Sequence, residues 1–134
     1  MEKMENSICL DSDILVELLR KNDEIAEWIK EKEENNILAT TTINLFELNY
    51  GAFSSNSPKV NYKDVEDVKN RLKILNLSDT SAEEAGKQKA NLEKQGNIID
   101  FRDILIGSIV LKQGFSLKTG NKKHFSRIKG LKLI

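Results

Sequence analysis

Short apolar segments alternate along this chain with longer segments of helical periodicity, and this alternation restricts the fold more than any other feature. Four segments, with a fifth candidate at the C-terminal end, have the length and character of strands: residues 7–10, 37–39, 74–77, 115–117 and 131–134. Strands that alternate with helices pair in parallel, with helices on both faces of the sheet. We therefore predict an α/β fold, namely a three-layer α/β/α sandwich around a central, mostly parallel sheet of four to five strands.

The intervening segments place apolar residues three and four positions apart, which is typical of amphipathic helices. We expect helices over residues 12–20, 23–34, 42–53, 62–72, 79–95, 100–113 and 122–128. Gly96 and Gly114 end two of them, and the segment 54–58 (SSNSP) is the one clear loop. No internal repeat, low-complexity segment or second domain boundary interrupts the pattern, so residues 1–134 are expected to form a single domain.

The composition argues against several classes of protein. The apolar segments are only a few residues long, so none is expected to span a bilayer, and the polar N-terminus MEKMENS lacks the apolar stretch of a secretory signal. Cys9 is the only cysteine, which excludes an internal disulfide and fits a reducing, cytoplasmic location. Because Cys9 lies inside an apolar strand, we expect a buried and unreactive thiol.

The charges are balanced in number but not in position. The chain has 21 Lys and Arg and 21 Asp and Glu, yet every acidic residue lies at or before Asp103. The basic segment that follows contains these cations: Lys112, Lys118, Lys122, Lys123, Arg127, Lys129 and Lys132. Such asymmetry favours a polyanionic partner, although a lysine-rich solvated surface explains it equally well.

Several acidic residues stand in apolar surroundings. Asp11 directly follows the first strand in ICLDSDIL, and the ligand sites of parallel sheets lie beyond the carboxyl ends of the strands. Glu47 lies within INLFELNY, and Asp100 and Asp103 lie within GNIIDFRDILIG. Each also has an ordinary explanation: Asp11 and Asp100 could cap helices, Asp13 and Asp103 could complement a helix dipole, and Glu47 could lie on an exposed polar face.

Taken together, these carboxylates favour a metal site. Three or more of them are expected at one rim of the sheet, where like charges repel and raise one another's pKa values. A divalent cation would remove this conflict. Oxygen ligands without a cluster of His or Cys favour Mg²⁺ or Mn²⁺ over zinc, and His124 is the only histidine. Carboxylate-bound Mg²⁺ commonly serves phosphoryl transfer or phosphodiester hydrolysis.

Four segments, in this order, resemble the PIN domain family and specifically the VapC toxins of prokaryotic toxin–antitoxin pairs. They are CLDSDIL, TTINLFELNYG, GNIIDFRDILIGSIVLKQG and LKTGNKKHFSRIKGLKLI. By this resemblance, Asp11, Glu47 and Asp103 match the three acids of the family's metal site and are the expected catalytic residues. The resemblance implies an endoribonuclease dependent on Mg²⁺ or Mn²⁺, in which the acidic cluster holds a metal-activated water that hydrolyses RNA phosphodiesters.

The resemblance also ranks the neighbouring ligand candidates. The family's spacing from glycine to isoleucine to acid fits Gly96, Ile99 and Asp103, so Asp103 is preferred to Asp100, which lies nearly one turn earlier and could assist. Asn121 stands where many relatives carry Asp. An amide can coordinate a metal or hold a water but adds no negative charge, so one tightly held metal is favoured over two.

Further residues and partners are implied by the same resemblance. The candidate RNA-binding and accessory residues are Ser12, Thr119, Asn121, Lys122, Lys123 and Arg127. His124 could contact a phosphate or base or be surface filler, and Phe125 is expected in the core. The implied partners are an RNA substrate, a VapB-like antitoxin and a second copy of the chain in a homodimer. Trp28, Tyr50 and Tyr62 are candidate contact surfaces.

Two other interpretations stay open from the residues alone. Asn121 in place of an acid would suit a catalytically inactive PIN-like module that only binds RNA or protein. The sequence Asp11-Ser12-Asp13 superficially resembles the Asp-x-Asp motif of haloacid-dehalogenase-type enzymes, which would make the protein an Asp-dependent phosphatase or phosphotransferase. That motif normally continues into a glycine-rich turn, whereas this chain continues with Ile14 and Leu15 into a helix.

Overall fold

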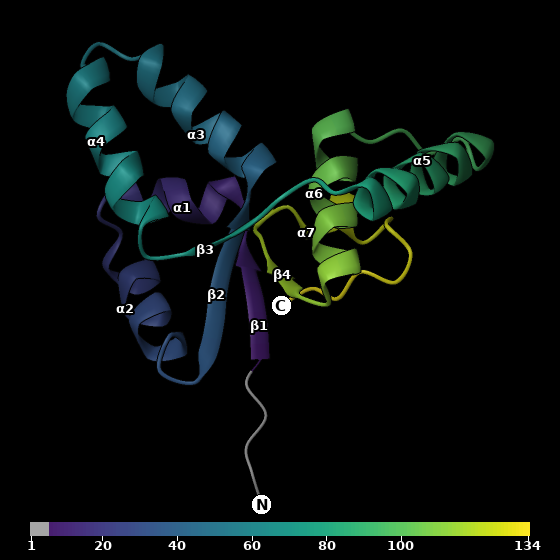
Figure 1. Cartoon of the computed structure of the whole chain (residues 1–134), viewed down its shortest axis with the longest axis horizontal. Helices are drawn as coiled ribbons and strands as arrows, with labels where there is room; N and C mark the ends of the chain where they lie inside the picture. Colours follow the sequence, from purple (N-terminus) through teal and green to yellow (C-terminus); the bar gives the residue numbers. More distant parts are fainter. Residues whose placement is uncertain (1–5) are drawn as a thin grey trace, which may run out of the picture.

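A computed structural model describes residues 6–134, and its strands form a four-stranded parallel sheet (Figure 1). The strands are β1 (Asn6–Leu10), β2 (Asn36–Thr41), β3 (Lys73–Leu75) and β4 (Ser116–Lys118). Their order across the sheet is β3-β2-β1-β4, and all three pairings are parallel. The predicted fold class is confirmed. Residues 1–5 of the polar N-terminus lie outside the described part.

The fifth strand predicted at residues 131–134 is reduced to a single bridge, in which Leu133 pairs in parallel with Leu117. The Leu117 N–H donates to the Lys132 carbonyl (2.8 Å), and the Ile134 N–H donates to the Leu117 carbonyl (2.9 Å). Gly130 adopts a positive φ of 90° and turns the chain toward β4.

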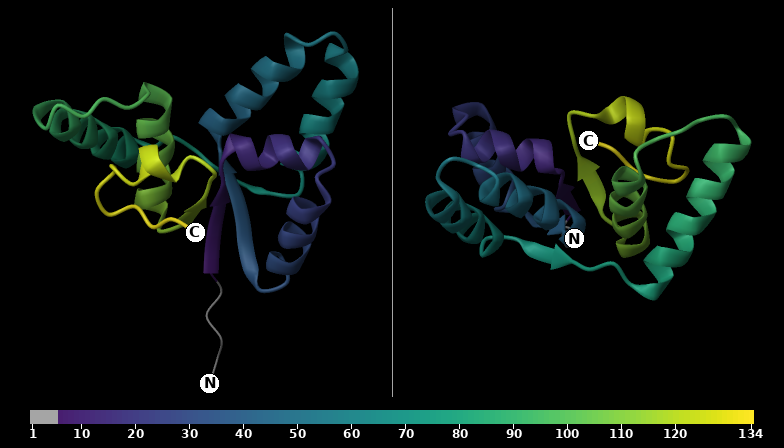
Figure 2. Two further views of the ribbon diagram at one scale, coloured as in Figure 1. Left: turned by 180° about the vertical axis from the view of Figure 1, so that it is seen from behind. Right: turned by 90° about the horizontal axis from the view of Figure 1, so that it is seen from above.

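Helices cover both faces of the sheet, as the two views of Figure 2 show. One face carries α1 (Ser12–Leu19), α2 (Asp23–Lys32), α3 (Thr42–Phe53) and α4 (Pro58–Lys69). The other face carries α5 (Asp79–Lys94), α6 (Phe101–Gln113) and the short α7 (Lys122–Phe125). The three-layer arrangement of the prediction is therefore confirmed.

Several element boundaries differ from the sequence prediction, by one to four residues. Helix α4 begins at Pro58, not at residue 62, because proline suits the first turn of a helix, where its missing N–H has no helical partner. The third strand ends at Leu75 instead of Leu77. Helix α7 ends at Phe125, and the Arg127 and Ile128 N–H groups form turn hydrogen bonds to the carbonyls three residues earlier.

The alternation of side chains along β1 and β2 divides the core into two clusters. Ile8, Leu10 and Leu38 pack with α1–α4, whereas Cys9 and Ala39 pack with α5–α7. Successive residues of a strand point to opposite faces, so each short strand serves both layers. Cys9 is fully buried, and burial raises the pKa of its thiol, which agrees with the predicted unreactive cysteine. No helix within residues 6–134 is long and apolar enough to cross a membrane.

Candidate active site

Asp11 lies where β1 ends and α1 begins, and its backbone belongs to both elements. Its N–H donates to the Lys118 carbonyl at 3.0 Å, which extends the β1–β4 ladder by one bond. Its carbonyl accepts from the N–H groups of Ile14 (3.1 Å) and Leu15 (3.2 Å) in the first turn of α1. Its side chain caps α1 by accepting from the Ser12 N–H at 2.8 Å. Strand and helix together therefore fix the position of this carboxylate.

The Asp11 carboxylate is buried and surrounded by neutral donors. Only 7% of the residue is exposed. Its Oδ2 accepts from the Thr119 hydroxyl at 2.7 Å, and its Oδ1 accepts from the Asn44 side-chain amide at 3.0 Å. Burial raises the pKa of Asp11, while the bonds from Thr119, Ser12 and Asn44 favour the ionised form and partly oppose that rise. The carboxylate is held in one orientation.

Asn44 is a central residue of the site that sequence reasoning missed. It is completely buried and uses its full hydrogen-bonding capacity. Its Oδ1 accepts from the Thr41 N–H (3.2 Å) and the Thr41 hydroxyl (2.7 Å), and its Nδ2 donates to Asp11 (3.0 Å) and to the Ser12 hydroxyl (2.8 Å). The available signal was the spacing Thr41-x-x-Asn44, which forms a capping box at the start of α3 one turn before Glu47.

Glu47 approaches Asp11 from α3 but is engaged by two other residues. Its Oε1 accepts from the Ser12 hydroxyl at 2.5 Å, and its Oε2 lies 3.7 Å from the Arg102 guanidinium. Within residues 6–134, no three His, Cys, Asp or Glu side chains already converge in a metal-binding arrangement. Both oxygens of Glu47 and both oxygens of Asp11 are instead engaged by other partners.

The N-terminus of α6 supplies the two remaining acids in different states. Asp100 caps the helix by accepting from the Arg102 N–H at 2.8 Å, and hydrogen bonds from Arg102 lower its pKa. Asp103 lies deeper, with 17% of its side chain exposed. Burial, and then the negative charges of Asp11, Asp100 and Glu47, raise its pKa to about 6. Burial is the larger cause of this rise, and repulsion between the carboxylates, which the sequence predicted, adds to it.

These side chains line one cleft of about 410 Å³ beyond the carboxyl ends of the strands. Its lining residues are Asp11, Ser12, Asp13, Glu47, Asp103, Gly120 and Asn121. Asp13 holds one wall in place by accepting from the Gly120 N–H at 2.9 Å. The structure therefore brings together the three predicted acids, Asp11, Glu47 and Asp103, from separate parts of the chain. Asp100 does not line this cleft.

Gly120 and Asn121 form the C-terminal wall of the cleft and lie within the basic segment. The Asn121 N–H donates to the Thr119 hydroxyl at 2.9 Å, and its side-chain amide lies 3.0 Å from the His124 Nδ1. Lys122 and Lys123 are exposed directly beside this wall. Arg127 instead donates to the carbonyl of Ile98 at 3.4 Å. Phe125 is fully buried, as predicted.

Residues 8–131 match the model of the PIN domain. The chain belongs to the PIN domain family. The match covers the first three segments on which the resemblance was based and the fourth as far as residue 131. The three acids of the motif lie in the cleft of this PIN domain, and the family's spacing distinguishes Asp103 from Asp100 in the same way as the geometry does.

Known proteins resemble the chain over 80% or more of its length. "Ribonuclease VapC2" of Rickettsia felis is 32% identical over 91% of this chain and 92% of its own. The tRNA(fMet)-specific endonuclease VapC of Salmonella typhimurium is 30% identical over 80% of this chain and 83% of its own. The crystal structure of VapBC2 from Rickettsia felis bound to a DNA fragment from their promoter contains a chain with a TM-score of 0.91 and 29% identity, covering 96% of this chain and 97% of that one.

Proposed function

We propose that this PIN domain is an endoribonuclease of the VapC type, the toxin of a VapBC-type pair, which hydrolyses RNA phosphodiesters with Mg²⁺ or Mn²⁺. One observation carries the proposal: Asp11, Glu47 and Asp103, supplied by three separate elements, line a single cleft. Burial, with the added charges of Asp11, Asp100 and Glu47, raises the pKa of Asp103 to about 6. The ribonuclease and tRNA endonuclease names of the relatives support the same activity.

The donor set of the cleft fits a divalent cation. The three acids offer carboxylate oxygens, the ligand type that Mg²⁺ and Mn²⁺ prefer. Their mutual repulsion, visible in the raised pKa of Asp103, is the conflict that a bound cation relieves. Asp100 and Asn121 are weaker candidates as ligands, because Arg102 engages Asp100 and the Asn121 amide pairs with His124. A bound cation would supply Lewis-acid stabilisation and lower the pKa of water.

The other residues of the site position these ligands and the RNA. Thr119, Ser12 and Asn44 orient Asp11 before any ligand binds, since each donates a hydrogen bond to its carboxylate. Lys122 and Lys123 are exposed beside the cleft wall, where their charges can contact the phosphates that flank the cut bond. Arg127 lies farther along the same segment and extends this basic surface.

Cleavage of defined RNAs tests the proposal. The purified protein is incubated with tRNA(fMet), an elongator tRNA and a ribosomal RNA fragment, in Mg²⁺, in Mn²⁺ and in EDTA. We expect discrete cleavage products with metal, none in EDTA and none with Asp11→Asn. If no RNA is cut but the wild type still binds RNA, the catalytically inactive module that Asn121 could indicate replaces the ribonuclease. A phosphoaspartate trapped on Asp11 would instead support the phosphatase alternative.

A VapB-like antitoxin is the partner that we propose for the acidic cleft. A second groove of about 420 Å³ runs between α1, α3 and α4 and shares Ser12 and Glu47 with the cleft. Its lining includes the apolar side chains of Val16, Leu19 and Leu48. A segment that enters the cleft could therefore continue along an apolar path. Copurification with the product of the neighbouring open reading frame tests this partner.

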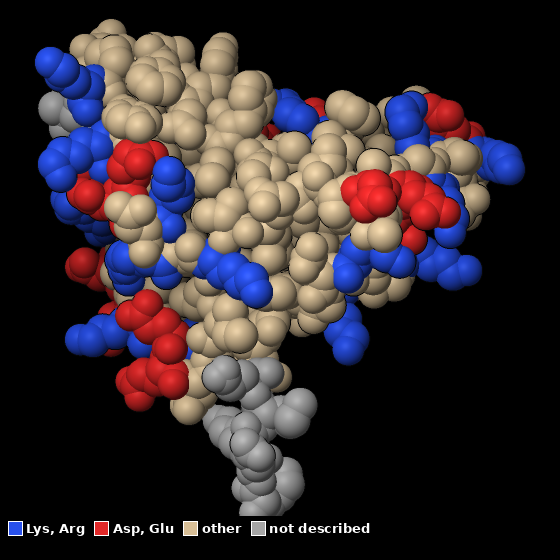
Figure 3. All heavy atoms as spheres, viewed as in Figure 1, with Lys and Arg blue, Asp and Glu red and all other residues tan. Residues whose placement is uncertain are grey.

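We also propose a location in the cytoplasm, which suits the free thiol of Cys9. A homodimer is a further part of the proposal. In the view of Figure 3, charged side chains gather over α2, α4 and α5, whereas the surface over α3 is largely uncharged. Phe46, Tyr50 and Phe53 are exposed on α3, at a spacing that suits one side of the helix. Trp28 is a weaker contact candidate, since it packs on the core and beneath Lys118. Light scattering after size-exclusion chromatography tests the dimer.

A further inference from the structure

Arg102 places a positive charge beside the acidic cleft and contacts two carboxylates, Glu47 in the lining of the cleft and Asp100 outside it. Its Nη1 lies 3.7 Å from Glu47 Oε2. Its Nε and Nη2 each donate to one oxygen of Asp100, both at 3.3 Å. The side chain is 50% exposed, so it can change its contacts without disturbing the core. A cationic group therefore already pairs with Glu47, one of the three acids that would hold the metal.

We propose that Arg102 is an exchangeable internal counter-cation, which holds Glu47 away from the metal-binding arrangement and releases it when a divalent cation binds. The inference rests on the proposed function, since it concerns the metal of that site. It gives a function to a positive charge that contacts Glu47 in a cleft lined by three acids. Ser12 is a neutral donor to the other oxygen of Glu47, so Arg102 is the partner that carries a charge.

Arg102 contacts Asp100 more closely than Glu47, so the contact with Glu47 is the one expected to break when a metal binds. Asp100 receives two hydrogen bonds from the guanidinium and a third from the Arg102 backbone N–H. Glu47 receives only a longer ion-pair contact. Exposed ion pairs contribute little stability, so a divalent cation in the cleft can displace the guanidinium from Glu47. Arg102 then remains on Asp100 and keeps that carboxylate out of the metal site.

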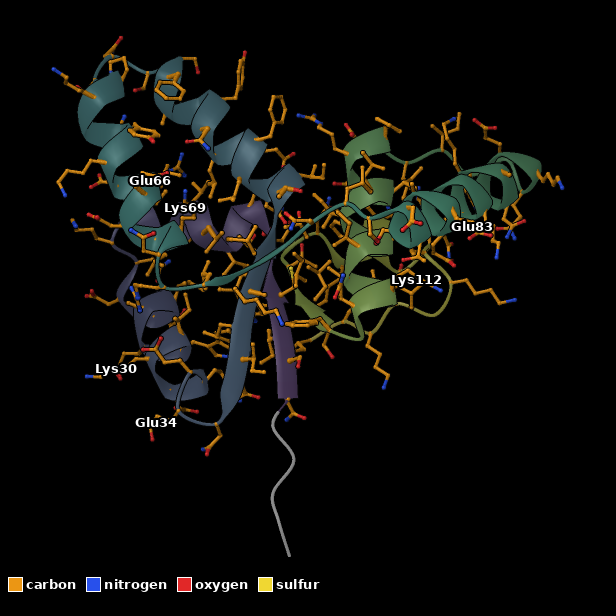
Figure 4. All side chains as sticks on the ribbon, viewed as in Figure 1. Lys30, Glu34, Glu66, Lys69, Glu83 and Lys112 are labelled. Atoms are coloured by element: carbon orange, nitrogen blue, oxygen red, sulfur yellow. The ribbon has the colours of Figure 1, made fainter. Side chains whose placement is uncertain are left out.

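Divalent-cation binding to the full chain tests this role without relying on cleavage. Isothermal titrations with Mn²⁺ and with Mg²⁺ compare the wild type, Arg102→Gln and Lys112→Gln. Lys112 lies in the last turn of the same helix (Figure 4), so its replacement removes the same charge far from the cleft. We expect Arg102→Gln to bind both metals about two- to fivefold more tightly, the range of an exposed ion pair. Lys112→Gln is expected to bind them like the wild type.

A double-mutant cycle assigns the effect to Glu47. If Arg102 competes for that carboxylate, Arg102→Gln loses its effect on Mn²⁺ affinity in a Glu47→Gln background. Equal or weaker metal binding by Arg102→Gln overturns the role of Arg102, while RNA cleavage by the wild type would leave the proposed function intact. If neither the wild type nor Arg102→Gln binds a divalent cation, the metal site and the role of Arg102 both fail. Circular dichroism in EDTA confirms that the variants are folded.

Discussion

The two sides of the acidic cleft hold their carboxylates by opposite means. On the side formed by β1 and α3, Asp11 is buried and accepts hydrogen bonds from the neutral donors of Thr119, Asn44 and Ser12. On the α6 side, Asp100 is exposed and pairs with the charged Arg102. Asp103, the deeper acid of that side, has the His124 ring at 3.9 Å.

The difference separates a fixed side of the cleft from an adjustable one. Hydrogen bonds from neutral donors to a buried carboxylate are little screened by salt, and breaking one leaves a desolvated donor or acceptor. Exposed ion pairs exchange with water and ions at little cost. We infer that the Asp11 side is organised before any ligand binds, whereas the α6 side adapts to the ligand. Each of the following predictions tests this division.

Replacement of one aspartate on each side gives the largest expected contrast. Asp11→Asn should reduce the rate of RNA cleavage by more than about 100-fold, because it removes the charge of a metal ligand on the fixed side. Loss of an outer-shell partner of a metal costs at most about 100-fold, and loss of a ligand should cost more. Asp100→Asn should reduce the rate by less than about tenfold, since Asp100 does not line the cleft. Single-turnover rates in Mg²⁺ provide the measurement, and equal losses for the two variants would contradict the division.

Loss of the Asn44 amide should affect both activity and stability. Asn44→Ala leaves the Thr41 hydroxyl and N–H without their acceptor and frees Asp11 to rotate. We expect cleavage to fall by about 10- to 100-fold and the free energy of unfolding to fall by about 1–3 kcal/mol. Urea denaturation measures the second effect.

Asn49 provides a matched control for that variant. It lies on the same helix, and its Oδ1 is buried without a hydrogen-bond partner within the described residues. Asn49→Ala should therefore change the free energy of unfolding by only about 0.5 kcal/mol. If Asn44→Ala behaved like this control, Asn44 would not be the residue that organises the fixed side.

These predictions involve residues that the sequence revealed to different degrees. Asp11 could be found because a charge that ends an apolar strand must lie at the rim of a parallel sheet. Glu47 and Asp103 followed from their apolar surroundings and from the family motif. Asn44 could not be found in this way, because a polar residue one turn before Glu47 also fits an exposed helix face. Its role depends on the buried junction of β2 and α3, which brings it to Asp11.

The fold was predictable where it depends on local patterns and less so where it depends on packing. The alternation of strands and helices predicted the layers and the parallel pairing. The contact between Arg102 and Glu47 joins two helices that are distant in the sequence, and no local pattern encodes it. At the C-terminal end, the β-like composition of residues 131–134 predicted a strand, whereas the structure forms a single bridge at Leu133.

The pH dependence of metal binding tests the adjustable side. The pKa of Asp103 is raised to about 6 by burial and by the charges of Asp11, Asp100 and Glu47, and His124 lies nearby and opposes that rise. Arg102 is a further charged neighbour of Asp103, since the Asp103 charge contributes to the raised pKa of the Arg102 guanidinium. Because a ligand must lose its proton to bind a metal, affinity should fall on the order of tenfold between pH 7 and pH 5. Mn²⁺ titrations at several pH values measure this fall, and a pH-independent affinity would place the binding elsewhere.

The smallest expected effect is a gain in stability when Asp103 loses its charge. Its pKa in the folded protein, about 6, is higher than its ordinary value of 3.8. Between these values the folded state holds more protons than the unfolded state, so this group's contribution to stability falls as the pH rises, and the penalty is complete above pH 6. In EDTA at pH 7, Asp103→Asn should therefore be more stable than the wild type, by on the order of 1 kcal/mol after allowance for solvent screening.

Thermal unfolding measures this gain as an increase in Tm of about 3 °C, which should disappear below pH 3.8, where both proteins are uncharged at this position. Glu83→Gln serves as the control, because it removes the same charge from an exposed site paired only with Lys87 at 4.0 Å. A destabilised Asp103→Asn would mean that Asp103 contributes structural contacts that outweigh its repulsion. The α6 side would then be as fixed as the Asp11 side, and the contrast between the two halves of the cleft would not hold.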